Sequence, residues 1–246
     1  MNIPVFPETK VALKGKKGLI VGIANDQSIA WGCAKAFRAL GAELAVTYLN
    51  DRAKKHVEPL AKVLEAPLFM PLDVNVEGQM EQVFERIGKE WGRLDFLLHS
   101  IAFSPKEALH GRVIDVGRDG FLKTMDVSCW SFLRMAHLAE PLMTNGGTMF
   151  TMTYYGSQMV VENYNIMGVA KAALEAAVRY VAAEVGPRAS AFTRSRPARC
   201  RRARRPASRS SMNFWTRRRA RRRREAWSRS TMSVPLRRSS PLTAQN

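Results

Sequence analysis

The 246-residue sequence predicts an α/β fold in which a parallel sheet is doubly wound, with helices on both of its faces. Three observations carry this prediction. Short apolar runs alternate with stretches of helical periodicity, and the first apolar run leads into a loop of small residues. In addition, 46% of the residues are hydrophobic, which is enough for one domain with a sizeable core.

The first strand, loop and helix suit a phosphate group. GLIVGI at 18–23 is predicted as a buried strand and 29–40 as a helix, which Gly41 ends as a C-terminal cap. Backbone amides at the helix start and the close backbone approach that Gly22 allows favour a pyrophosphate. Because the glycines do not follow G-x-G-x-x-G, a simple tight turn explains this segment equally well.

The alternation continues, with strands predicted at 43–48, 67–72 and 94–100 and helices at 51–64 and 76–91. In a parallel sheet of this kind, ligands bind at the carboxyl ends of the strands. We therefore expect one crevice that collects the residues at these ends, namely Gly22, Tyr48, Asp73, Ser100 and Tyr154.

Two tyrosines and one lysine, Tyr154, Tyr164 and Lys171, lie in the run that leads into a later helix. A phenol near a fixed ammonium can hydrogen-bond an oxygen that gains negative charge, and the lysine can also hold a sugar hydroxyl. Tyrosine and lysine at this spacing also occur by chance in many proteins. A catalytic role is therefore predicted because of the nucleotide crevice that accompanies them.

These motifs resemble those of bacterial NADH-dependent enoyl-acyl carrier protein reductases, which are divergent short-chain dehydrogenases. The resemblance covers Leu13 to about Pro187 and rests on four blocks: GLIVGIANDQSIAWG at 18–32, LDV at 72–74, HSIAFSP at 99–105 and the segment 154–171. More ordinary short-chain dehydrogenases have a T-G-x-x-x-G-x-G loop, an N-N-A-G segment and a tyrosine four positions before the lysine. This chain has none of these. The resemblance implies a Rossmann-like fold.

The resemblance implies a role for each catalytic residue. Tyr164 would donate a hydrogen bond to the thioester carbonyl oxygen as hydride reaches the β-carbon, so that the enolate is stabilised. Lys171 would hold the nicotinamide ribose. Tyr154 would line the acyl site as a second catalytic tyrosine, and Ser104 would lie beside the acyl chain.

The implied cofactor is NADH. Its pyrophosphate side would contact Gly22, Ser28 and Ile29, its adenosine would contact Leu49, Asp73 and Val74, and its nicotinamide ribose would lie near Ile101. From the sequence alone, Asp73 is equally well an ordinary turn or helix-cap residue. Asp51 favours NADH, whereas Arg52, Lys54 and Lys55 could tolerate a 2′-phosphate, so NADPH is an alternative.

The implied substrate is an enoyl chain on acyl carrier protein, reduced in fatty-acid elongation. A carbonyl-reducing short-chain dehydrogenase is the alternative enzyme, against which the longer Tyr–Lys spacing argues. The implied assembly is a homotetramer, in which a long helix at 119–139 would pack between subunits. A core face within one subunit would explain its apolar side equally well, which is formed by Met125, Trp130, Phe132, Leu133 and Met135.

Metal and membrane sites are not predicted. The cysteines at 33, 129 and 200 have no metal-ligand spacing, and their odd number favours a reducing cytoplasm. Cys33 is predicted to be buried in the core. The four histidines form no ligand cluster, and for His99 a hydrogen-bonded structural role is favoured over catalysis. No apolar run approaches a membrane span, so we expect a cytoplasmic protein.

The net charge of +18 belongs to the C-terminal segment. Residues 189–246 hold 18 arginines and one acidic residue, Glu225, and carry +17, whereas the 188 residues before them carry +1. We therefore predict a dinucleotide-binding domain over 1–188 and a disordered Arg-rich tail over 189–246. A nucleic-acid-binding arm is one interpretation of the tail, because arginines neutralise phosphates and Trp215 and Trp227 could stack on bases.

A shifted reading frame explains the tail better. Read from one base earlier, possible codons for ASAFTRSRPAR at 189–199 encode GIRVHAISPGP, which resembles the sixth strand and following loop of the reductase family. The same offset turns MNFW at 212–215 into DELL and STMSV at 230–234 into IDDVG. We therefore expect a base lost near Arg188, a tail that binds no nucleic acid, and a disrupted C-terminal part of the fold that leaves a sheet edge unpaired.

Overall fold

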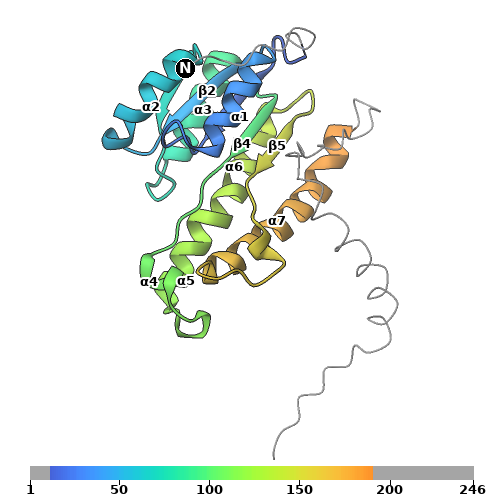
Figure 1. The fold of residues 1–246 in the computed structure, drawn as a ribbon. Coiled ribbons are helices and arrows are strands. Elements are labelled where there is room, and N and C mark those ends of the chain that lie inside the picture. The colour runs from blue at the N-terminus through green and yellow to red at the C-terminus, as the bar shows by residue number, and fades with distance from the viewer. Residues whose placement is uncertain (1–11, 191–246) are drawn as a thin grey trace, which may run out of the picture. The chain divides into compact units, whose positions relative to one another are not determined.

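The computed structural model describes residues 12–190, which contain a five-stranded sheet in the order β3-β2-β1-β4-β5 (Figure 1). All four strand pairings are parallel. The strands are β1 (Lys17–Val21), β2 (Glu43–Tyr48), β3 (Leu68–Pro71), β4 (Phe96–His99) and β5 (Thr148–Thr151). The predicted parallel α/β fold is confirmed.

The described residues contain seven α-helices: α1 (Ile29–Ala39), α2 (Asp51–Val63), α3 (Gln79–Trp91), α4 (Lys106–His110), α5 (Arg118–Met125), α6 (Ser131–Ala139) and α7 (Asn165–Ser190). Short helical turns are η1 (Val113–Asp115), η2 (Asp126–Trp130), η3 (Glu140–Leu142) and η4 (Tyr155–Ser157). The elements that the sequence predicts from 18 to 100 are all present, with ends that differ by up to three residues. The largest difference is at the start of α3, where Gly78 takes a left-handed φ of 80° and the helix begins only after it.

Two hydrophobic clusters cover the two faces of the sheet. On one face, Trp31 of α1 and Val57 of α2 pack with strand residues such as Leu44. On the other face, Ile87 of α3 and Met135 of α6 pack with strand residues such as Leu97. Because successive side chains of a strand point to opposite faces, strands buried on both faces are apolar throughout. The predicted double winding is therefore confirmed.

The helix predicted at 119–139 is present as a continuous helical segment from Arg118 to Ala139 that contains a π-helical turn. α5 and α6 are joined by η2, a π-helical turn that inserts extra backbone and changes the direction in which later side chains point. Only part of the predicted apolar side is buried within the chain. Phe132 and Met135 are buried, whereas Trp130 is 47% exposed and Leu133 is 38% exposed.

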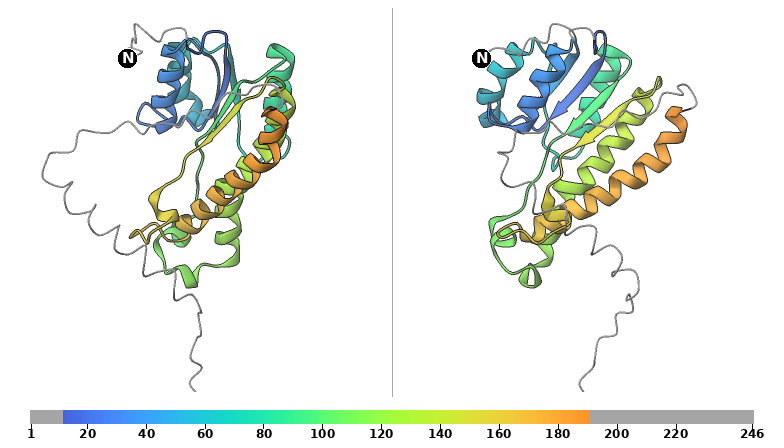
Figure 2. Two further views of the ribbon diagram at one scale, coloured as in Figure 1. Left: turned by 90° about the vertical axis from the view of Figure 1, so that its right-hand side faces the viewer. Right: turned by 45° about the vertical axis from the view of Figure 1, so that its right-hand side comes forward.

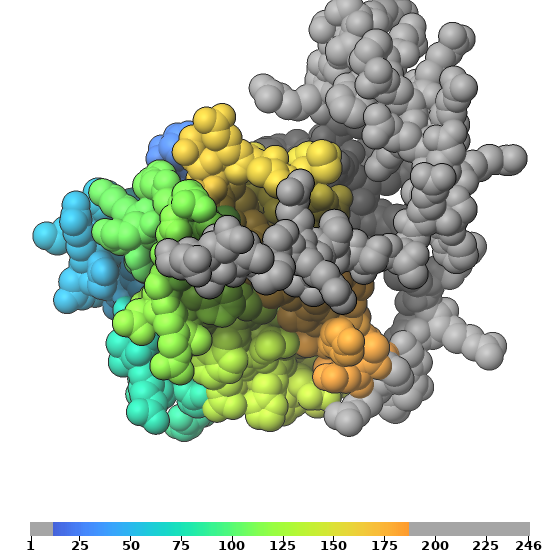
Figure 3. Space-filling view, turned by 90° about the horizontal axis from the view of Figure 1, so that it is seen from below, coloured from blue at the N-terminus to red at the C-terminus, as the bar shows by residue number. Residues whose placement is uncertain are grey.

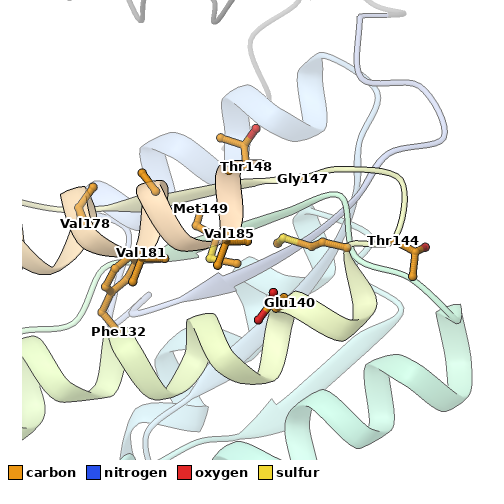
Figure 4. A pocket seen from close by; sticks show the side chains of 12 residues that line it. Phe132, Glu140, Thr144, Gly147, Thr148, Met149, Val178, Val181 and Val185 are labelled. Atoms are coloured by element: carbon orange, nitrogen blue, oxygen red, sulfur yellow. The ribbon is translucent and has the colours of Figure 1, made fainter. Parts of the chain in front are cut away.

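β5 forms one edge of the sheet as described. Its residues are partly exposed, whereas all residues of β4 are buried. Beside this edge lies a groove of about 450 Å³ between β5, α6 and the last turns of α7 (Figure 4). Its lining includes Phe132, Met149, Val178, Val181 and Val185. The apolar lining agrees with the expectation that this side of the sheet exposes apolar surface.

The last described helix lies along α6, as two views of the chain show (Figure 2). Its side chains join a third cluster with Cys129 and Phe132, in which Leu174 is fully buried. α7 is described as far as Ser190, two residues beyond the predicted domain boundary at 188, which stays a prediction. Apart from Ala189 and Ser190, the predicted tail over 189–246 lies outside the described residues.

Candidate active site

A cavity of about 410 Å³ lies at the carboxyl ends of β1 to β4. Five of the residues predicted to bind the cofactor line it: Gly22, Leu49, Asp73, Val74 and Ile101. They come from four separate strand ends, as expected for a doubly wound sheet. Ser100 lines the cavity as expected, but Tyr48 and Tyr154, which were also expected at this crevice, do not. The Tyr48 ring packs against Phe69, with 4.6 Å between the ring centroids, and the Tyr154 ring packs against Tyr164 instead.

Gly22 allows the β1 end to approach β4. Its φ is 105°, and a Cβ atom added there would clash with the carbonyl oxygen of Ser100. The amide of Ser100 also donates to the carbonyl of Val21 at 2.9 Å. A glycine is therefore required at this position, both for the left-handed backbone and for the space.

Ser28 organises the loop before α1. Its hydroxyl oxygen accepts hydrogen bonds from the amides of Ala24 and Asn25, at 3.0 and 2.9 Å, and donates to the carbonyl of Asn25 at 2.6 Å. Ile29, the first residue of α1, is 67% exposed. These contacts give Ser28 a structural role in the loop, and the predicted pyrophosphate contacts of Ser28 and Ile29 stay predictions.

Asp73 forms a local turn, and its predicted contact with the adenosine stays a prediction. Its Oδ1 atom accepts hydrogen bonds from the backbone amide and the side-chain amide of Asn75, at 2.9 and 2.6 Å, which forms a local turn. The same residue lines the cavity. It does not cap α3, because Gly78 occupies the capping position of that helix.

Sequence reasoning missed Lys123, which reaches this cavity from α5 and donates a hydrogen bond to the side chain of Asn75. No local pattern identifies it, because α5 is brought to the strand ends only by the tertiary fold. Ala102 and Phe103 also line the cavity. They follow the end of β4, so the strand-end rule could have included them.

Tyr154 and Tyr164 lie ring to ring beyond the end of β5. Their ring centroids are 4.8 Å apart and the rings meet at 65°, an edge-to-face contact. Burial and the neighbouring phenol of Tyr154 raise the pKa of Tyr164. Tyr164 therefore keeps its proton at neutral pH and can act as a hydrogen-bond donor.

Lys171 is buried on α7, with only 4% of its surface exposed. Its Nζ atom donates a hydrogen bond to the carbonyl oxygen of Met152 at 2.7 Å, and burial lowers the pKa of the ammonium. The amide of Met152 donates to the carbonyl of His99 at 3.2 Å. Since Ser100 and Ile101 directly after His99 line the cavity, Lys171 is held at the strand end next to it.

His99 is a fully buried link between β4, β5 and α6. Its Nε2 lies 2.8 Å from the Ser131 hydroxyl and its Nδ1 lies 3.0 Å from the Thr151 hydroxyl. The Ser131 hydroxyl donates its proton to the carbonyl of Val127, so Nε2 of His99 carries the ring proton and Nδ1 accepts. These contacts agree with the predicted hydrogen-bonded structural role.

Burial, followed by the charge of Lys171, lowers the pKa of His99 to about 3. An unfolded histidine has a pKa near 6.5, so between these values only the unfolded chain binds the proton. The free energy of unfolding should therefore fall as the pH drops below about 6.5, by up to ~1.4 kcal/mol per pH unit from this group. Urea unfolding of the protein with the reading frame restored, at several pH values, measures the slope.

His99→Gln removes this titration and should flatten the pH dependence. His137→Gln removes an exposed imidazole of α6 and is the matched control. Equal slopes in the parent protein and in His99→Gln would contradict the prediction.

Ser104 lies on the segment between β4 and α4. Its hydroxyl is 2.9 Å from the hydroxyl of Thr124, which itself donates to the carbonyl of Gly120 at 2.7 Å. This contact connects the predicted acyl-site residue to α5. The segments around α4 and α5 share one face of the molecule with the loop after β5 and the start of α7 (Figure 3).

Within residues 12–190, no group of three or more potential ligand side chains could hold a metal ion. In the same range, no helix combines the length and apolar character needed to cross a membrane. Cys129 is buried, whereas Cys33 faces the core as predicted but is only partly buried there.

A protein-family model described as Enoyl-(Acyl carrier protein) reductase matches residues 22–191, well over half of the chain. The chain belongs to this family. Enoyl-(acyl-carrier-protein) reductase (NADH) 2 of Rhizobium meliloti is 51% identical over 176 residues, which are 72% of this chain and 66% of that protein. The chain thus spans about two thirds of the length of this curated relative.

Solved structures of the enoyl reductase family agree with the fold. The enzyme of Anaplasma phagocytophilum in complex with NAD matches with a TM-score of 0.70 at 50% identity, over 72% of this chain and 67% of that one. The enzyme of Bacillus cereus with NADP+ and an indole naphthyridinone matches with a TM-score of 0.70 at 41% identity, over 72% and 70%. The family resemblance inferred from the sequence is therefore confirmed.

Proposed function

We propose that the chain is an NADH-dependent enoyl-acyl carrier protein reductase, which reduces the trans-2 double bond of an enoyl chain in fatty-acid elongation. The observations that carry this proposal are the buried Lys171, held through Met152 at the strand end next to the cavity, and the edge-to-face pair of Tyr154 and Tyr164 beyond the end of β5. Curated relatives named as NADH enoyl reductases, at 49 to 51% identity, support the reaction class.

The cavity has the features that a dinucleotide needs. Gly22 leaves space for close backbone approach, Leu49 and Val74 supply apolar walls, and Asp73 supplies a carboxylate acceptor. α1 directs its N-terminus toward the same loop, which favours an anionic pyrophosphate. When bound, NADH would supply the hydride, and the protein supplies orientation and electrostatic stabilisation.

The tyrosines and the lysine account for the remaining chemistry. As hydride adds to the β-carbon, the electrons of the double bond move toward the thioester carbonyl oxygen. Tyr164 remains protonated and donates a hydrogen bond to that oxygen, so the enolate is stabilised. A proton from water then adds to the α-carbon and completes the reduction. Lys171 holds the ribose hydroxyls of the cofactor, and Tyr154 shapes the acyl side of the site.

The remaining finer assignments are part of the same proposal. We assign Ser28, Ile29 and Ile101 to the cofactor site and Ser104 to the acyl site. A cytoplasmic homotetramer is proposed, and the exposed Trp130 and Leu133 of the η2–α6 segment support a subunit contact there. NADH is preferred over NADPH because of Asp51 at the start of α2, while Lys54 is engaged with the Tyr48 ring at 5.6 Å.

The decisive assay compares substrates and cofactors. Two proteins would be tested with crotonyl and 3-oxoacyl thioesters. One is made from the gene as it stands, and the other from a gene with one base restored near codon 188. We expect the restored protein to oxidise NADH with the enoyl thioester and to show at least about a hundredfold lower kcat/KM with the 3-oxoacyl thioester. Preferential reduction of the 3-oxoacyl thioester would overturn the proposal in favour of a carbonyl reductase.

A further inference from the structure

One face of α7 holds the loop that carries Tyr154. Gly168, Lys171 and Glu175 follow each other at intervals of three and four residues, which places them on the same side of the helix. Lys171 binds the carbonyl of Met152 at the start of the loop. Glu175, one turn further along, binds the loop twice more.

Glu175 anchors the loop on both sides of Tyr154. Its Oε1 atom accepts a hydrogen bond from the hydroxyl of Thr153 and another from the hydroxyl of Ser157, each at 2.6 Å. Thr153 directly precedes Tyr154, and Ser157 ends the turn η4 that follows it. Distances this short are typical of hydroxyl groups that donate to an ionised carboxylate.

The charged form of Glu175 is favoured where it lies. The hydrogen bonds from Ser157 and Thr153 lower the pKa of its carboxyl group, to which Gln158 and the charge of Arg179 add. The carboxylate therefore stays ionised at neutral pH, and both hydroxyl groups keep a strong acceptor.

The anchored turn also determines where Tyr164 lies. Gly156, inside the turn, packs against the Tyr164 ring so closely that an added Cβ atom would clash with it. An added Cβ atom at Gly168 would lie 2.8 Å from the carbonyl oxygen of Gly156. The turn is thus confined between the Tyr164 ring and α7, and a shift of the turn would move both phenols.

We propose that Glu175 is a positioning residue, which fixes the turn from Thr153 to Ser157 and through it the relative placement of Tyr154 and Tyr164. The predicted effect of Glu175 on catalysis rests on the proposed enoyl reduction. Its predicted effect on the position of the turn does not depend on which reaction the enzyme catalyses.

The structural part is tested by amide hydrogen exchange on the full chain, both as written and with the reading frame restored. The reporter amides belong to Ser157, Gln158 and Met159, which donate to the carbonyls of Tyr154 and Tyr155 at 3.0 to 3.1 Å. In Glu175→Ala these amides should exchange about ten- to a hundredfold faster, while amides of β1 and β4 are unchanged. Glu175→Gln keeps an acceptor oxygen and should recover part of the protection.

Matched variants separate positioning from general destabilisation. Glu184→Ala removes an exposed carboxylate from the same helix and should leave the reporter amides unchanged. The double variant Thr153→Val, Ser157→Ala should match Glu175→Ala, and combining all three changes should add nothing further. Unchanged reporter amides in Glu175→Ala, or equal acceleration throughout the sheet, would overturn the proposal.

The catalytic part is read in the frame-restored enzyme. Glu175→Ala should lower kcat for the enoyl thioester about ten- to a hundredfold, because misplacement of reacting groups by a fraction of an ångström costs this much. The Kd for NADH, from fluorescence titration, should change less than about twofold, as the cavity lining is untouched. Normal kcat with loosened reporter amides would overturn the catalytic part. If the parent enzyme did not reduce enoyl thioesters, the proposed function would be refuted. The hydrogen-exchange result would then decide the structural role of Glu175 by itself.

Discussion

Tyr164→Phe in the frame-restored enzyme should lower kcat for enoyl reduction about a hundred- to a thousandfold. The phenol is kept protonated by burial and by its neighbour Tyr154, and its loss removes the donor to the developing enolate oxygen. Because the ring remains, the edge-to-face contact with Tyr154 and the fold should be retained. Steady-state kinetics with crotonyl thioester and NADH measure the effect.

Lys171→Met should act on cofactor binding as well as on kcat. Methionine has about the length of the lysine stem and suits a buried position, but it cannot donate to the ribose hydroxyls or to the carbonyl of Met152. We expect the KM for NADH to rise about tenfold or more and the double variant with Tyr164→Phe to be inactive.

Tyr155→Phe is the control for both changes. It removes a phenol from the same loop that is 59% exposed, and should leave the kinetics close to those of the parent enzyme. If Tyr164→Phe combined with Lys171→Met turned over enoyl thioesters at an undiminished rate, the proposed mechanism would be refuted.

Restoring one base near codon 188 should convert an aggregation-prone polypeptide into a soluble, cooperatively folded one. In the chain as written, β5 ends the described sheet and the apolar groove lies beside it. An unpaired strand edge next to exposed apolar surface favours association with other chains. The restored sequence GIRVHAISPGP would follow α7 and can add a parallel strand to this edge, because βαβ connections place the next strand beside the last.

The expected result is a rise in soluble yield and a thermal unfolding transition at least about 10 °C higher, since strand addition buries several large apolar side chains. A third protein, in which the residues after Arg188 are replaced by a Gly/Ser-rich segment of equal length, is the control. It removes the arginines without supplying a strand and should stay unstable. Equal stability of the written and restored proteins would contradict the prediction, as would an intact reading frame on both strands of the gene.

Much of the nucleotide half could be predicted from sequence because its strands are buried on both faces. ELAVTY at 43–48 is a nearly continuous apolar run with turn signals after it, and its boundaries agree with β2. Gly22 and Asp73 were found by the rule that ligands lie at strand ends, which depends on topology alone.

The second half was harder to predict because its geometry depends on contacts between distant segments. No local pattern signals the π-helical turn η2, and the sequence alone does not show that Trp130 and Leu133 are exposed while Phe132 and Met135 are buried. Glu175 was missed for the same reason. Its partners Thr153 and Ser157 precede it by 22 and 18 residues and meet it only because the loop folds back on α7.

The wide π-helical turn η2 lets the side chains of α5 and α6 point in directions that one regular α-helix would not allow. Before it, α5 directs Lys123 into the strand-end cavity, and after it, α6 packs Met135 against the sheet and α3 and Phe132 against α7. In a uniform helix, the spacing between these residues would dictate how they point relative to each other. A one-residue deletion within Ser128–Trp130 would therefore rotate α5 relative to α6 about the helix axis. It would move Lys123 relative to the core without replacing any residue that lines the cavity.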